Sequence, residues 1–130
     1  MRDKVEYWLD LAYDDISIVE ILLNSEKYLQ AGFFCHLTTE KALKAIIASV
    51  TLEVPPKTRD LTKHAELSGI FDDLTESQLS LLEELNPLNI EARYPGYKSS
   101  IIKMLTDEKT LKLFKETEEF LCWIKQKLGK

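Results

Sequence analysis

The chain has 130 residues, a formal net charge of −5, 45% hydrophobic residues and 30% charged residues. These values are typical of one globular domain, which we expect over residues 1–130. The negative charge excludes attraction of nucleic acid by the overall field, so any such contact needs a local basic patch. The charged N-terminus, the absence of a long apolar run and two cysteines without metal-type spacing favour a cytoplasmic protein without a membrane segment.

Residues 3–24 carry apolar side chains at intervals of three and four, which predicts a first helix. A second, shorter apolar stripe lies beside the main one and is interrupted by Asp15. Two stripes indicate contact with more than one neighbouring helix or with another subunit. The main stripe consists of Val5, Trp8, Leu9, Ala12, Ile16, Val19 and Leu23, and the second of Leu11, Ile18 and Leu22.

The stretch from Tyr28 to Val50 lacks proline and is rich in good helix formers, so we expect a second helix, antiparallel to the first. Its apolar residues occur on every side of the helical wheel, which is typical of a buried helix. His36, Glu40 and Lys44 break this pattern and form one ridge at intervals of four. The ridge is interpreted either as an ion-pair network that fixes the bundle or as a cleft for a phosphate or nucleotide. The first interpretation is favoured, because clusters of ionisable side chains are often structural ion-pair networks.

A stiff linker containing Pro55 and Pro56 follows the second helix, since proline cannot continue it. Asp60 is expected to cap a third helix over residues 61–72, which Gly69 weakens. The side chains expected to point inward from this helix are Leu67, Ile70 and Phe71.

Residues 75–78 form a capping box, which predicts a fourth helix as far as Leu85. Thr106 is expected to cap the last helix, after a long loop over residues 87–106. No segment alternates with the period of a strand. The predicted fold class is therefore all-α, an antiparallel up-and-down bundle of about five helices, three long and two short. The predicted inward stripe of the last helix is Leu113, Thr117, Phe120, Leu121, Ile124 and Leu128.

Arg59 and His64 form the first group that could carry chemistry. Arginine stabilises a phosphorane-like oxyanion and histidine transfers protons near neutral pH, a combination that suits metal-independent RNA cleavage. An arginine and a histidine at this spacing more often lie at the solvent-exposed start of a helix and carry no chemistry. The long loop holds a second group, because cations beside aromatic rings hold phosphates and stack bases. Its cations are Arg93, Lys98 and Lys103, and its rings are Tyr94 and Tyr97. The alternative is an Arg93 ion pair with tyrosines packed on the bundle.

A metal site at the ridge would need Asp14 or Asp15 from the first helix. Hard metals usually take more oxygen ligands than this arrangement offers, so we expect no metal and no cofactor. A glycine-rich phosphate loop and a serine elbow are both missing from the sequence.

Four segments together resemble HEPN domains (higher eukaryote and prokaryote nucleotide-binding), in order and over nearly the whole chain. The most specific one is the second helix, where Tyr28, Ala31, Phe33 and His36 precede the run from Glu40 to Ala45. The other three are Ala12-Tyr13-Asp14-Asp15-Ile16, Pro56-Lys57-Thr58-Arg59-Asp60-Leu61 and Arg93-Tyr94-Pro95.

The resemblance implies a helical bundle, usually a homodimer, often encoded beside a minimal nucleotidyltransferase with which it acts as a toxin–antitoxin pair. It also implies binding of a nucleotide or RNA rather than DNA. We expect the ligand or partner to bind at His36, Glu40, Lys41, Lys44, Arg93 and Tyr94.

Many HEPN toxins are ribonucleases that use an arginine followed by a histidine near the last helices. Here no histidine follows Arg93, whereas Arg59 and His64 have a suitable spacing at the entry to the third helix. The sequence therefore leaves three functions open: a nucleotide- or partner-binding module, a metal-independent endoribonuclease using Arg59 and His64, and a purely structural dimerisation domain.

Overall fold

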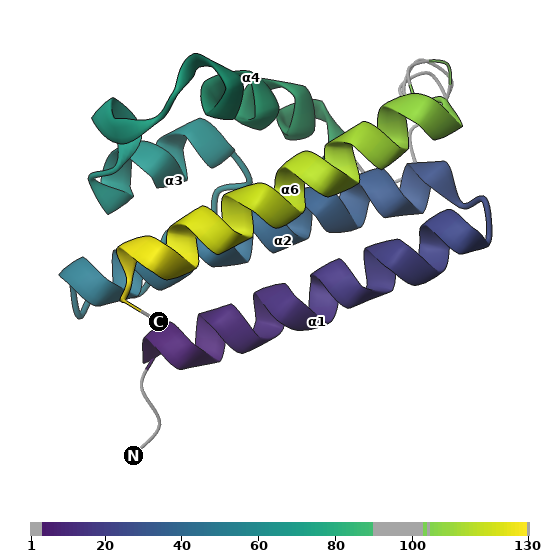
Figure 1. The fold of residues 1–130 in the computed structure, drawn as a ribbon. Coiled ribbons are helices and arrows are strands. Elements are labelled where there is room, and N and C mark those ends of the chain that lie inside the picture. Colours follow the sequence, from purple (N-terminus) through teal and green to yellow (C-terminus); the bar gives the residue numbers. More distant parts are fainter. Residues whose placement is uncertain (1–3, 90–102, 104, 130) are drawn as a thin grey trace.

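The computed structural model describes residues 4–89, 103 and 105–129, and within these ranges it contains helices and no strand (Figure 1). This confirms the predicted all-α fold with three long and two short helices. The α-helices are α1 (Lys4–Asn24), α2 (Tyr28–Val50), α3 (Leu61–Ser68), α4 (Glu76–Leu85) and α6 (Asp107–Lys127), and the 3-10 helices are η1 (Phe71–Asp73) and η2 (Asn86–Asn89).

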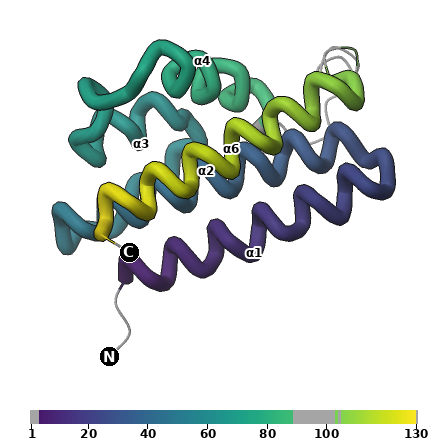
Figure 2. The backbone as a smooth tube through the Cα atoms, in the orientation of Figure 1, coloured from purple at the N-terminus to yellow at the C-terminus, as the bar shows by residue number. Residues whose placement is uncertain are grey.

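Helix α2 is the centre of the bundle, as its apolar wheel predicts. It contacts α1, α6, α3 and α4, and all of its residues except Gln30, Ser49 and Val50 are buried or half-buried. The tube in Figure 2 shows α1 running antiparallel to α2, with α3 and α4 on the other side of α2 from α1. The ridge that carries His36 and Glu40 therefore lies on the most enclosed helix.

Gly32, near the start of α2, allows a close approach by two leucines. A Cβ atom at this position would lie 3.0 Å from Leu105 and 3.1 Å from Leu88, both measured to Cδ1. These distances are shorter than ordinary van der Waals contact. The missing side chain thus lets the segments that carry Leu88 and Leu105 pack directly on α2.

Helix α3 begins as predicted and ends earlier. The Asp60 carboxylate accepts a hydrogen bond of 3.0 Å from the Thr62 amide and caps the helix. Gly69 adopts a left-handed φ of 82°, which ends the helix at Ser68 rather than near residue 72. The chain then changes direction, so Ile70 is buried but Leu67 is 49% exposed, and the inward position expected for Leu67 is wrong.

The two predicted caps of the later helices are both present. Thr75 and Gln78 exchange side-chain-to-amide bonds of 2.9 and 3.1 Å at the start of α4. Thr106 Oγ1 accepts a bond of 3.1 Å from the Lys109 amide at the start of α6. The inward stripe of α6 is confirmed for Leu113, Thr117, Phe120, Leu121 and Ile124, which are buried. Its last predicted member, Leu128, follows the helix and is half-buried against the core.

Candidate functional site

Two buried histidines hold the linker that enters α3. His36 Nε2, on α2, lies 2.9 Å from the carbonyl oxygen of Arg59, and His64 Nε2, on α3, lies 2.8 Å from that of Thr58. A carbonyl oxygen can only accept, so both Nε2 atoms donate. Two consecutive carbonyls of the linker are therefore fixed by side chains from two different helices.

Both imidazole rings have 0% exposure, and this burial sets their protonation. Burial lowers the pKa of His36 to about 4, although the Arg59 carbonyl and Glu40 oppose the change. The pKa of His64 is lowered for the same leading reason. Near pH 7 each ring is therefore neutral, with its proton on Nε2. The Nδ1 atom of each ring is buried and has no hydrogen-bond partner among the described residues.

Glu40 is the negative centre of the site. Its Oε2 atom accepts a bond of 3.0 Å from Lys44 Nζ, and its Oε1 atom lies 3.8 Å from Arg59 Nη1. The same Oε1 atom lies 3.9 Å from Nδ1 of His36. One carboxylate therefore faces two cations. Because both histidines are neutral, the cluster formed by His36, Glu40, Lys44, Arg59 and His64 has a net charge of one positive unit.

The two cations differ in their access to solvent. The Lys44 side chain is 15% exposed and its Nζ atom lies 5.0 Å from the centre of the Trp8 ring, a cation–π contact with α1. The Arg59 side chain is 53% exposed. The buried cluster therefore reaches solvent through the guanidinium of Arg59.

The structure brings together five of the sequence-predicted site residues and separates one. The five are His36, Glu40, Lys44, Arg59 and His64. Lys41 instead binds Asp15 on α1, with 2.5 Å between Nζ and Oδ2, and so holds the two helices together. Arg93 and Tyr94 lie outside the described residues, so their expected part in ligand binding with the ridge stays a prediction.

The prediction of a catalytic Arg59–His64 pair remains a prediction. His64 is enclosed, and its Nε2 atom is engaged by the Thr58 carbonyl. Proton transfer to a substrate would require its Nδ1 atom, which is buried. This geometry explains His64 as a structural tether more directly than as a general base.

Trp8 is the residue at this site that sequence reasoning missed. Its place in the apolar stripe of α1 assigned it to the core, and it does pack against buried residues. Its contact with Lys44 depends on how α1 and α2 align, which no local pattern in either segment reveals.

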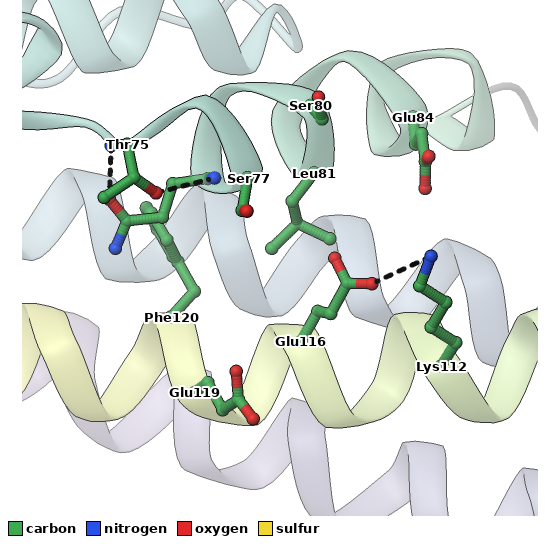
Figure 3. A pocket seen from close by; sticks show the side chains of 10 residues that line it. Thr75, Ser77, Ser80, Leu81, Glu84, Lys112, Glu116, Glu119 and Phe120 are labelled. Carbon is green, nitrogen blue, oxygen red and sulfur yellow. Dashed lines mark hydrogen bonds and ion pairs between the residues drawn. The ribbon is translucent and has the colours of Figure 1, made fainter.

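A groove between α4 and α6 is a second feature that the sequence did not predict. It has a volume of about 590 Å³, and Leu81 and Phe120 point into the space between the helices (Figure 3). Its polar lining consists of Thr75, Ser77, Gln78, Ser80, Glu84, Lys112, Glu116 and Glu119. Within the described ranges, no group of three potential ligands is placed to hold a metal ion.

A family model described as the HEPN domain matches residues 5–127, nearly the whole chain, which confirms the resemblance drawn from the four segments. No curated protein and no solved structure matches the chain. Among the described residues, each helix is too short or too polar to span a bilayer.

Proposed function

The chain belongs to the HEPN domain family, and from this premise we propose that it is a nucleotide- or partner-binding module. Its anion-binding groups are Lys44 and Arg59, and Glu40 holds them in place. Arg93 and Tyr94 are proposed to complete the ligand contacts from the loop before α6.

The observation that carries this proposal is the sharing of one carboxylate by two cations. Arg59 is half-exposed and lies farther from Glu40 than Lys44 does, at 3.8 Å against 3.0 Å. Its guanidinium can therefore turn to a phosphate while Lys44 still neutralises Glu40. Arginine binds phosphate oxygens through two parallel N–H groups, which suits this position.

Calorimetry with ATP, AMP and a short RNA tests the proposal. We expect saturable binding of at least one of them, lost or weakened about tenfold or more by Arg59→Gln and by Lys44→Met. Lys112→Met is the matched control, because Lys112 also has a glutamate partner four residues away but lies on α6. Absence of binding to the wild-type chain, or equal weakening by all three variants, contradicts the proposal.

A minimal nucleotidyltransferase is the proposed protein partner, and the two proteins are proposed to act as a toxin–antitoxin pair. The chain itself is proposed to form a homodimer. The support is family membership together with the exposed cation of the linker. Co-expression with the product of a neighbouring nucleotidyltransferase gene, followed by affinity purification, tests it. If the two proteins do not co-purify, the proposal of a nucleotidyltransferase partner is rejected, and the proposal of nucleotide binding is unaffected.

A metal-independent ribonuclease is the second candidate function, favoured by the position of Arg59 and His64 at one linker. It predicts RNA cleavage in the presence of a chelator, abolished by Arg59→Gln and His64→Ala. Intact RNA, or equal cleavage by the variants, rejects it. A purely structural dimerisation domain predicts that Lys44→Ala and Arg93→Ala leave both ligand binding and cellular phenotype unchanged.

A further inference from the structure

Helix α1 carries apolar side chains on a face that the bundle leaves uncovered. Tyr7 is 48% exposed and Ile21 is 63% exposed, while Leu11 and Ile18 between them are half-buried. None of these four side chains is among the described residues that pack against the buried core. Figure 1 shows α1 at the edge of the bundle. We name Tyr7, Leu11, Ile18 and Ile21 the outer stripe.

The outer stripe has the spacing of a coiled-coil seam. Positions 7, 11, 14, 18 and 21 alternate steps of four and three, which keeps one narrow face of a helix turned to a partner helix. Asp14 occupies the middle position. It is exposed, and Ser17 contacts its main-chain oxygen rather than its carboxylate. Within the described ranges the Asp14 carboxylate has no cation beside it.

This central acid argues against a second copy of the chain as the occupant. Two α1 helices packed in parallel and in register place Asp14 opposite Asp14. Antiparallel packing that overlaps the whole stripe does the same, because position 14 is its midpoint. Opposed carboxylates repel each other, and an apolar surrounding strengthens the repulsion.

The charge of α1 favours a basic occupant. The helix carries Glu6, Asp10, Asp14, Asp15 and Glu20 against one basic residue, Lys4. Lys41 of α2 compensates Asp15. Asp14 and Glu20 are exposed and have no ion-pair partner among the described residues, so they give the stripe a negative field. Such a field repels nucleic acid and attracts a cationic helix.

We infer that the outer stripe docks an amphipathic helix of another protein, with apolar residues at heptad positions and a lysine or arginine opposite Asp14. Apolar contacts would supply the buried area, and the central ion pair would fix register and partner choice, as single polar positions do in coiled coils. This surface uses neither Lys44 nor Arg59, so it is independent of nucleotide binding.

Two synthetic peptides of about three heptads test the inference, one with lysine and one with glutamate at the central position. By fluorescence anisotropy, the wild-type chain should bind the lysine peptide at least about tenfold more tightly than the glutamate peptide. Asp14→Lys should reverse this preference. Ile21→Ser should weaken the lysine peptide several-fold, whereas Leu52→Ser, at a 90% exposed position outside the stripe, should not.

The variants change exposed side chains, and thermal melting checks that each one is folded. Equal affinity for both peptides, or no effect of Ile21→Ser, overturns the inference. Sedimentation of the chain alone supplies a further test. A wild-type dimer that Ile21→Ser dissociates would assign the stripe to a second copy and would also overturn it, whereas unchanged assembly agrees with it.

Discussion

Two lysine–glutamate pairs with the same spacing have different surroundings in this molecule. On α2, Glu40 and Lys44 are 5% and 15% exposed and lie 3.0 Å apart. On α6, Lys112 and Glu116 are 65% and 28% exposed and lie 3.8 Å apart, at the rim of the groove (Figure 3). The spacing in sequence is identical, so the tertiary environment decides which pair contributes to the stability of the fold.

The buried pair is part of a connected set, whereas the exposed pair has no further ion-pair partner in the part of the chain that the structure describes. Glu40 also faces Arg59, whose main-chain oxygen is bound by His36. A buried carboxylate costs desolvation energy unless cations compensate it, so each member of the set depends on the others. The exposed pair on α6 is hydrated and screened by salt, and its loss leaves no buried charge.

The largest expected difference between the two pairs follows removal of each carboxylate. Glu40→Gln should destabilise the fold by about 3 kcal/mol, because Lys44 loses its buried counter-charge. Glu116→Gln should change stability by less than about 0.5 kcal/mol. Glu40→Gln should also strengthen anion binding, since the cluster gains a positive charge. Urea denaturation and calorimetry measure these effects; equal destabilisation by the two variants would contradict the contrast.

Acidification should lower the stability of the fold, because the buried histidines resist protonation. The pKa of His36 is about 4 in the folded chain and 6.5 when unperturbed, so above about pH 6.5 the ring is neutral in both states. As the pH falls from about 6.5 to about 4, the unfolded chain gains a proton that the folded chain does not. Stability should fall by about 3 kcal/mol in this window.

The lowered pKa of His64 acts in the same direction. Denaturation of wild type and His36→Leu between about pH 7 and about pH 5 isolates the contribution of His36, because both proteins share the same carboxylates. The variant should lose less stability on acidification. A pH dependence as steep as that of wild type would show that His36 takes up its proton in the folded state.

A smaller loss is expected when the tether to the linker is cut. His64→Leu leaves the Thr58 carbonyl without its donor and should cost about 1–3 kcal/mol. Lys63→Ala, at the exposed neighbouring position, should stay within about 0.5 kcal/mol. Thermal unfolding of both variants makes the comparison. A His64→Leu variant as stable as wild type would show that the bond from His64 to the Thr58 carbonyl does not stabilise the fold.

A small effect is expected for the ion pair that joins α4 and α6. Lys109 Nζ lies 3.0 Å from Glu84 Oε2, with the side chains 31% and 39% exposed. A double-mutant cycle with Lys109→Met and Glu84→Gln should give a coupling of about 0.2–1 kcal/mol, decreasing with added salt. A larger coupling that is insensitive to salt would mean that this ion pair is as enclosed as the cluster on α2.

The fold was largely predictable because its signals are local. The bounds of α2, the capping box at Thr75 and the cap at Thr106 follow from residues close together in sequence. The end of α3 was misplaced because Gly69 adopts a left-handed conformation, which a glycine permits without requiring. Once that turn forms, Leu67 faces solvent.

The site was predictable in part. The ridge on α2 follows from helical periodicity, and the pairing of Glu40 with Lys44 is the network interpretation that the spacing favours. The bonds from the histidines to main-chain oxygens were not predictable, because carbonyl groups carry no sequence signature. The pairing of Lys41 with Asp15 depends on the alignment of α1 with α2, which neither helix encodes alone.

The side-chain resonance of Arg59 Nε, followed by NMR during titration with ATP, tests most directly whether the exposed cation of the cluster binds a phosphate. We predict that this resonance shifts saturably in the wild-type chain and that Glu40→Gln reaches the same end point at a lower ATP concentration. An Arg59 resonance that stays fixed while other signals of the protein shift would contradict an anion site at Lys44 and Arg59.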